Sequence, residues 1–278
     1  MANIPKKVEE RLTAGLKKFQ PIVDSAKSRD VNESDTVVII TDLLHEVFGW
    51  DKYSELTSEF PIRGTHCDLA IKFKDKEKLR LIIEVKAIGV ELKDQHTKQA
   101  IDYAANEAVD WVLLTNGINW RLYRVLFTKP IGQDPVCDFD FLSLTSKRAD
   151  DLALLFILTK ESWEKSALSE YYAHQKALSR FSIAGVILSV PVLALIRREL
   201  RRLSPDVKIE CEQIEEVIRT QIIKREILEG EKLTDAEHAI NRSAGRPLRE
   251  TSTPWEASAS ASSSPTAPIG TTPTTSPN

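Results

Sequence analysis

The stretch CDLAIKFKDKEKLRLIIEVKA, residues 67–87, predicts two β-strands joined by a charged turn. Successive side chains of a strand point to opposite faces, so Glu84 and Lys86 in the second strand lie on the same face. Asp68 projects from the first strand, sixteen positions before Glu84. If the strands pair antiparallel through the turn, we expect two carboxylates and one ammonium group to meet at one end of the hairpin.

Two neighbouring carboxylates repel each other, and burial makes their ionisation more costly. A divalent cation removes both penalties, and oxygen ligands of this kind suit Mg²⁺ or Mn²⁺. Asp68 and Glu84 are therefore candidate metal ligands, and Lys86 is a candidate to orient or activate a water molecule or to stabilise negative charge. The chemistry this favours is phosphodiester hydrolysis. The alternative is a pair of solvated strand ends, since a Glu-x-Lys triplet is common by itself.

Segments on both sides of the hairpin predict an alternation of helices and strands. An amphipathic helix is expected within residues 1–30, and a second helix follows, with Ser34 or Asp35 as its N-cap and Gly49 at its end. Another helix is expected from about Lys93 to Ala108, and then two strands that flank the turn residues 116–117. This order predicts an α/β fold with a mixed sheet flanked by helices.

Several of these segments together resemble the PD-(D/E)XK nuclease superfamily, and more narrowly the N-terminal nuclease domain of type I restriction enzyme R proteins. The motifs are CDLAI and IIEVKA in the hairpin, with Cys67 where the superfamily name has proline, and QAIDYA in the following helix. The segments NESDTV, LLHEVFGWD and WVLLTNGINWRLYRV are also similar to that family, so the resemblance spans roughly residues 30–127.

The resemblance implies a restriction-endonuclease-like core and a metal-dependent nuclease that acts on DNA in a restriction or host-defence system. It also implies that Gln99 and Tyr103, four positions apart on one helix face, join the catalytic set Asp68, Glu84 and Lys86, either by supporting Lys86 or by contacting the DNA backbone. A glutamate of the first helix is a further metal ligand in the family. Two residues of this chain fit that position, Glu33 best and Glu46 as a substitute. The alternative function is a DNA-binding or assembly module that keeps the nuclease fold without turnover.

The C-terminal half of the sequence changes character. Residues 31–147 hold the nuclease-like segment, and residues 148–242 predict a helical module, with VKIE at 207–210 as a candidate short strand. Residues 243–278 are rich in Ser, Thr, Pro and Ala and predict a disordered tail. The uncharged run at 181–196 has sixteen residues, whereas a membrane span needs roughly 20. A buried helix is therefore favoured over a membrane anchor.

Composition limits the remaining classes of function. The net charge of −3 argues against a protein that coats nucleic acid through bulk charge. A local basic groove is still compatible with the sequence. Its candidate residues lie around the hairpin and in IRRELRR: Arg63, Lys72, Lys74, Lys76, Lys78, Arg80, Lys93, Lys98, Arg197, Arg198, Arg201 and Arg202. The same residues can equally serve solubility. The chain lacks a G-x-x-x-x-G-K-[ST] loop, so no ATP-driven motor is expected. Three scattered cysteines and the absence of a signal peptide favour the cytoplasm, and a homo-oligomer formed through the helical module is compatible with the sequence.

Overall fold

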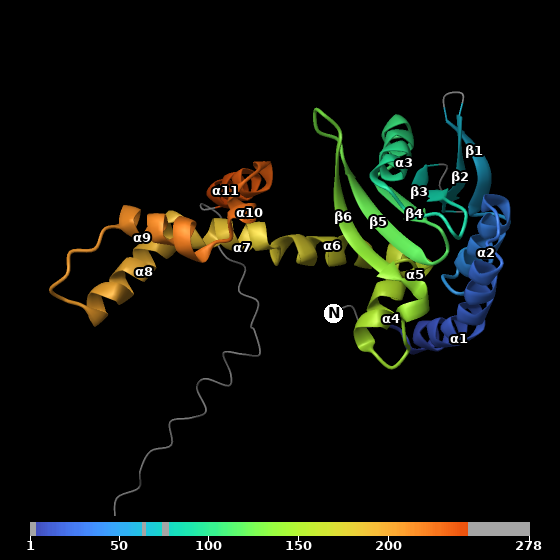
Figure 1. The fold of residues 1–278 in the computed structure, drawn as a ribbon, viewed down its shortest axis with the longest axis horizontal. Coiled ribbons are helices and arrows are strands. Elements are labelled where there is room, and N and C mark those ends of the chain that lie inside the picture. Colours follow the sequence, from blue (N-terminus) through green and yellow to red (C-terminus); the bar gives the residue numbers. More distant parts are fainter. Residues whose placement is uncertain (1–3, 63–64, 74–77, 244–278) are drawn as a thin grey trace, which may run out of the picture. The chain divides into compact units, whose positions relative to one another are not determined.

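A computed structural model describes residues 4–62, 65–73 and 78–243 of the chain. Its main feature is a mixed six-stranded sheet flanked by helices, followed by a helical C-terminal part (Figure 1). This confirms the predicted α/β fold class. The chain divides into two compact units, of which the first ends at Ser179 and the second begins at Arg180.

The first unit contains the sheet and the helices that cover it. Its elements are α1 (Lys6–Ser28), α2 (Glu33–Glu46), β1 (Leu56–Ile62), β2 (Thr65–Lys72), β3 (Leu79–Val85), α3 (Asp94–Asn106), β4 (Trp111–Thr115), β5 (Asn119–Leu126), β6 (Gly132–Asp140), a short 3₁₀ turn (Phe141–Ser143), α4 (Ala149–Phe156), α5 (Lys160–Glu164) and α6 (Ala167–Ala177). The strands follow one another in the sheet in chain order, and only β3 and β4 pair in parallel, with α3 as the crossover between them.

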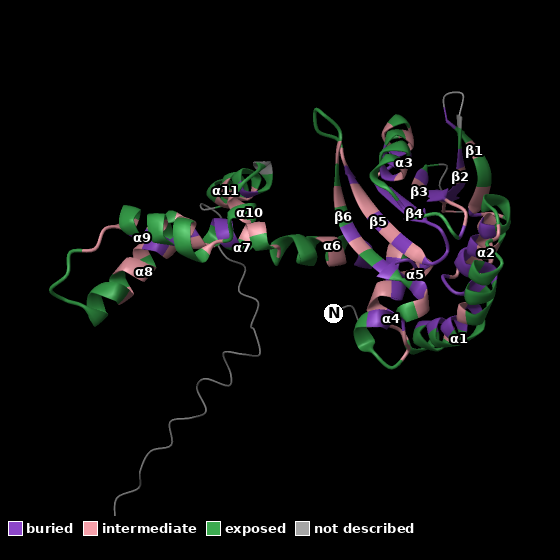
Figure 2. Ribbon diagram, in the orientation of Figure 1, coloured by how far each residue is buried: buried purple, intermediate pink, exposed green. Residues whose placement is uncertain are grey.

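The two faces of the sheet are covered by different helices. Apolar residues of α1 and α2 pack with Leu69, Ile71, Leu81 and Ile83 on one face, whereas α3 packs on the other (Figure 1). The central strands β3 and β4 are consequently buried almost throughout (Figure 2). A charged side chain placed in β3 is therefore an exception that needs a partner.

Helix α2 begins two to three residues before the position expected from its sequence. The N-cap is Asn32, whose side chain accepts a hydrogen bond of 2.9 Å from the backbone N–H of Asp35, so Ser34 and Asp35 as the predicted N-cap residues are wrong. Asn, Ser and Asp can all cap a helix, but the backbone of Asn32 has the extended conformation that an N-cap requires. Asn32 thereby fixes the first turn of α2, which carries Glu33.

We expect Asn32→Ala to lower the free energy of unfolding by about 1 kcal/mol, because an N-cap side chain satisfies an otherwise unpaired helix N–H. Chemical denaturation measures the change. The conservative variant Asn32→Asp keeps a capping oxygen and should stay within about 0.5 kcal/mol of the parent. Equal losses in both variants would show that the cap is not the cause.

Helices α4, α5 and α6 belong to the first unit. Leu152, Leu155 and Phe156 of α4 lie in the same hydrophobic cluster as the sheet, and Tyr172 of α6 donates a 2.8 Å hydrogen bond to Asp134 of β6. The unit therefore continues past residue 148, where the change in sequence pattern suggested the start of the helical module. The apolar side of α4 covers the sheet, which sequence periodicity alone does not reveal.

The second unit is helical and has its own small core. Its elements are α7 (Arg180–Ile187), α8 (Val190–Leu203), α9 (Cys211–Val217), a short π-helix (Ile218–Ile222), α10 (Arg225–Leu228) and α11 (Glu231–Ser243). Ala184, Leu188, Leu193 and Ile214 lie in its hydrophobic cluster. The segment at 207–210 forms no strand, so that prediction is wrong, and the predicted tail from residue 244 onward lies outside the described residues.

The apolar run at 181–196 forms two helices instead of one buried helix. It breaks between α7 and α8, and Val190 at the start of α8 is 78% exposed. In the described part of the chain no single helix has the length and apolar character to span a membrane, although α7 and α8, bent by 59°, meet that test as a pair.

Candidate active site

Strands β2 and β3 bring Asp68 and Glu84 to the same end of the hairpin. Leu69 pairs with Ile83 in the antiparallel ladder, so Asp68 and Glu84 are the next residues along each strand. The backbone N–H of Val85 donates a 2.6 Å hydrogen bond to Oδ2 of Asp68, which ties the aspartate to β3. The predicted convergence of the two carboxylates follows from this register.

Lys86 follows directly on β3 and lies between two glutamates. Its Nζ is 2.8 Å from Oε1 of Glu84 and 3.6 Å from Oε2 of Glu33. Its backbone N–H donates a 2.9 Å hydrogen bond to the carbonyl oxygen of Thr115, which extends the parallel pairing with β4 by one residue. The lysine is thus held by its backbone as well as by its ammonium group.

Helix α3 contributes the two remaining predicted residues. The amide Nε2 of Gln99 donates to Oε1 of Glu84 at 2.8 Å and lies 3.1 Å from the hydroxyl oxygen of Tyr103. Their spacing of four residues places both side chains on one face of the helix, as the sequence indicates. Gln99 and Lys86 therefore share the same oxygen of Glu84.

Burial dominates the electrostatics of the two carboxylates. Burial, joined by the charges of Asp68 and Glu33, raises the pKa of Glu84 to about 7, although its hydrogen bond with Lys86 opposes the shift. Burial also raises the pKa of Asp68, against the opposing effects of the Val85 N–H and Lys86. For Lys86, burial by itself lowers the pKa, but the hydrogen bond to Glu84 and three nearby carboxylates outweigh it and raise the pKa.

One oxygen of this cluster is buried without a partner. Oε2 of Glu84 has no hydrogen bond, although Oε1 has two. A buried carboxylate oxygen that is left unpaired costs free energy, so Oε2 of Glu84 needs a partner that this structure does not show. No group of three or more His, Cys, Asp or Glu side chains in the described ranges is arranged to hold a metal ion.

The structure separates the two candidate glutamates of α2. Glu33 lies at the rim of the cluster, half exposed and paired with Lys86. Glu46, at the other end of the helix, instead pairs with Lys18 of α1. Sequence reasoning missed His96, in the first turn of α3. The pKa of His96 is lowered by burial and by the charges of Lys86 and Lys93, which places the imidazole beside the site.

The predicted basic residues do not all gather at the carboxylates. Lys93 and Lys98 are exposed around the start of α3, on the side of the site. Lys72, Lys78 and Arg80 instead lie at the opposite end of the β2–β3 hairpin. The arginines of α8 belong to the second unit, where Arg198 and Arg202 both pair with Glu199. Arg63, Lys74 and Lys76 lie outside the described residues.

Comparison with known proteins relates the first unit to restriction enzymes. A family model described as the type I restriction enzyme R protein N terminus matches residues 40–130. This range runs from the middle of α2 into the connection between β5 and β6 and contains Asp68, Glu84 and Lys86. No curated protein and no solved structure matches the chain. The segment 40–130 is therefore similar to the N-terminal region of type I restriction R proteins.

Proposed function

We propose that this protein is a metal-dependent nuclease of the PD-(D/E)XK type that hydrolyses phosphodiester bonds in DNA. The observation that carries the proposal is the buried carboxylate of Glu84, which has one unpaired oxygen and lies beside Asp68 and Lys86. A structural ion pair would need only one lysine and one carboxylate. The second carboxylate and the open oxygen are explained by a cation that binds between them.

Asp68 and Glu84 would hold the metal ion. The oxygens of these two side chains suit a hard cation. Oε2 of Glu84 has no hydrogen-bond partner, and the Val85 N–H occupies only Oδ2 of Asp68. Mg²⁺ prefers such ligands and keeps several waters, and Mn²⁺ shares this preference. When bound, the ion would supply positive charge that polarises a phosphoryl oxygen and makes a water molecule easier to deprotonate.

Lys86 would act as an ammonium group. Its raised pKa keeps it protonated at neutral pH, which favours charge stabilisation over proton abstraction. Glu84 and Glu33 fix the ammonium from two sides, so its charge is oriented before substrate binds. Preorganised charge of this kind stabilises the negative charge that develops on a phosphate during hydrolysis.

DNA is proposed as the substrate because the matched family belongs to restriction enzymes and because Lys93 and Lys98 lie exposed near the site. Lysines of this type contact phosphates without reading sequence.

A cleavage assay tests the proposal. The full chain is incubated with supercoiled plasmid and with single-stranded DNA in Mg²⁺, Mn²⁺ or EDTA. We expect cleavage with either metal and none in EDTA. Cleavage that persists in EDTA would contradict the metal-dependent mechanism. Retention of DNA in a gel-shift assay without cleavage under any metal would support a non-catalytic binding module instead.

Gln99→Ala is expected to reduce cleavage about 10- to 100-fold, because Gln99 fixes the carboxylate of Glu84 through Oε1. Tyr103→Phe removes only the hydroxyl that lies against the Gln99 amide and should reduce cleavage less. Cleavage rates across a Mg²⁺ titration measure both effects. A Gln99→Ala loss that saturating Mg²⁺ rescues would assign the residue to metal binding, whereas an unchanged rate at all concentrations would rule out this role.

A further inference from the structure

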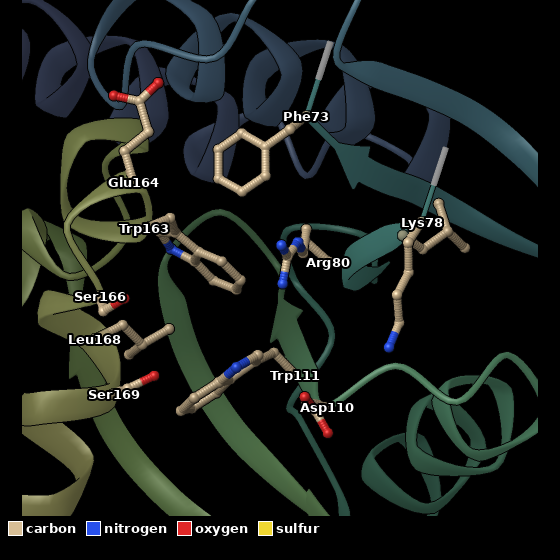
Figure 3. A pocket seen from close by; sticks show the side chains of 11 residues that line it. Phe73, Lys78, Arg80, Asp110, Trp111, Trp163, Glu164, Ser166, Leu168 and Ser169 are labelled. Carbon is tan, nitrogen blue, oxygen red and sulfur yellow. The ribbon is translucent and has the colours of Figure 1, made fainter. Parts of the chain in front are cut away.

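A cavity lies in the first unit, at the end of the β2–β3 hairpin opposite to the carboxylates (Figure 3). It has a volume of about 420 Å³, within the range of roughly 300–1,000 Å³ that is typical of small-molecule sites. Strands β3 and β4 line one side of it and helices α5 and α6 the other. Arg80 and Glu84 are four residues apart in β3, which separates them by roughly 13 Å along the strand.

A β-bulge turns Arg80 into this cavity. Ile71 pairs with Leu81, but Lys72 pairs with Leu79, so Arg80 is one extra residue on β3 without a partner in β2. Bulges redirect a side chain and are common beside functional sites. The guanidinium of Arg80 lies 5.4 Å from the centre of the Phe73 ring, between that ring and the two tryptophans of the cavity (Figure 3).

Among the residues that the structure describes, two cations of the cavity lining have no acidic partner. Nε of Arg80 is buried and has no hydrogen bond, and neither Arg80 nor Lys78 forms an ion pair with any residue in the described ranges. The acids of the lining are already engaged: Asp110 is 3.4 Å from Arg124, and Glu164 is 4.0 Å from Lys160. A buried guanidinium nitrogen without an acceptor indicates a missing anion.

The walls of the cavity are aromatic and held in place. The rings of Trp111 and Trp163 meet edge to face at 6.0 Å, and Nε1 of Trp163 donates to the carbonyl oxygen of Ile157 at 3.0 Å. Arg124 lies 4.8 Å from the Trp111 ring. Together with Phe73 these rings offer rigid apolar surface, on which a planar heterocycle packs well. The cavity thus combines a site for an anion with a site for a ring.

We propose that this cavity binds a phosphorylated nucleotide, with its phosphate at Arg80 and Lys78 and its base against the tryptophans. The same chemistry is offered by a free nucleoside monophosphate and by the 5′-phosphorylated end of a nucleic acid strand. The inference does not depend on the nuclease proposal, because none of the residues Asp68, Glu84 and Lys86 lines this cavity.

Isothermal titration calorimetry of the full chain in EDTA tests the inference. The ligands are adenosine and cytidine monophosphates, with inorganic phosphate and adenosine as their separate parts. Short oligonucleotides with a 5′-phosphate or a 5′-hydroxyl test the strand end. We expect saturable binding at one site that needs both phosphate and base. Arg80→Gln should raise the dissociation constant of the nucleotide by about tenfold or more, and Lys78→Gln should also raise it. Binding of the monophosphates with no difference between the two oligonucleotides would identify a free nucleotide, and tighter binding of the 5′-phosphorylated strand than of the 5′-hydroxyl strand would identify a strand end.

A control variant keeps the test specific. Lys147→Gln removes an exposed lysine that does not line the cavity, so it should bind like the parent. Thermal unfolding establishes that Arg80→Gln is folded. Lys78 is exposed, so Lys78→Gln tests the phosphate contact without disturbing buried structure. Equal affinity in Arg80→Gln, Lys78→Gln and parent would overturn the proposal, as would adenosine or inorganic phosphate binding as tightly as the nucleotide.

Discussion

Lys86→Met is expected to reduce DNA cleavage by about 100-fold or more while DNA binding persists. The substitution removes the ammonium group that lies 2.8 Å from Glu84 and 3.6 Å from Glu33 but keeps an unbranched side chain of similar length. Loss of one preorganised charge that stabilises a transition state typically costs this much in rate. Single-turnover cleavage in Mg²⁺ measures the effect, and a gel shift in EDTA measures binding.

The matched control for this variant is Lys18→Met. Lys18 and Glu46 form another lysine–glutamate pair, but they join α1 and α2 away from the site. Lys18→Met should therefore cleave at the parental rate. Because Lys86→Met leaves Glu84 buried without its counter-charge, thermal unfolding of the variant is measured beside cleavage, so that a loss of stability is not taken for a loss of chemistry. Parental cleavage by a folded Lys86→Met would refute the role of the lysine.

Glu84→Gln is expected to abolish metal-dependent cleavage, with a loss of more than about 100-fold, because it replaces the buried carboxylate with a neutral amide of the same shape. The same exchange at Glu46, which the sequence offered as an alternative ligand, should leave cleavage unchanged. Initial rates over a range of Mg²⁺ concentrations measure both variants. Equal losses in the two variants would contradict the assignment.

The metal-free protein should also become less stable as pH rises. The pKa of Glu84 increases from 4.5 to about 7 on folding, so the folded state binds more protons than the unfolded state between these values. Stability therefore falls from about pH 4.5 to pH 7, by up to about 3 kcal/mol, and Asp68, whose pKa is also raised, adds in the same direction. Denaturation in EDTA should show a smaller pH slope for Glu84→Gln, and an unchanged slope would exclude Glu84 as its source.

The alternation of side chains along strands predicted much of the site. Glu84 and Lys86 had to share a face, and the length of the hairpin set Asp68 near them. The helical spacing of Gln99 and Tyr103 was equally local information. The hydrogen bonds of Gln99 to Glu84 and to Tyr103 depend on how α3 crosses β3, and the family pattern indicated the two residues but not these partners.

Features that depend on long-range packing could not be predicted from the sequence. The choice of Asn32 over Ser34 as N-cap depends on backbone conformation, because both residue types can cap a helix. The inclusion of α4 in the first core depends on which surface its apolar face covers. The bulge at Arg80 is a difference in strand register, and no local pattern in LRLIIEV reveals that one residue lacks a partner.

We expect Asp68 and Glu84 together to bind a divalent metal ion, and a titration with Mn²⁺ measures this binding without any need for cleavage. Electron paramagnetic resonance of free Mn²⁺ during titration of the protein gives the number of sites and the affinity. We predict saturable binding that Mg²⁺ competes for, that Asp68→Asn and Glu84→Gln each abolish, and that Glu46→Gln preserves. Undiminished Mn²⁺ binding in both Asp68→Asn and Glu84→Gln, or no binding by the parent, would contradict it.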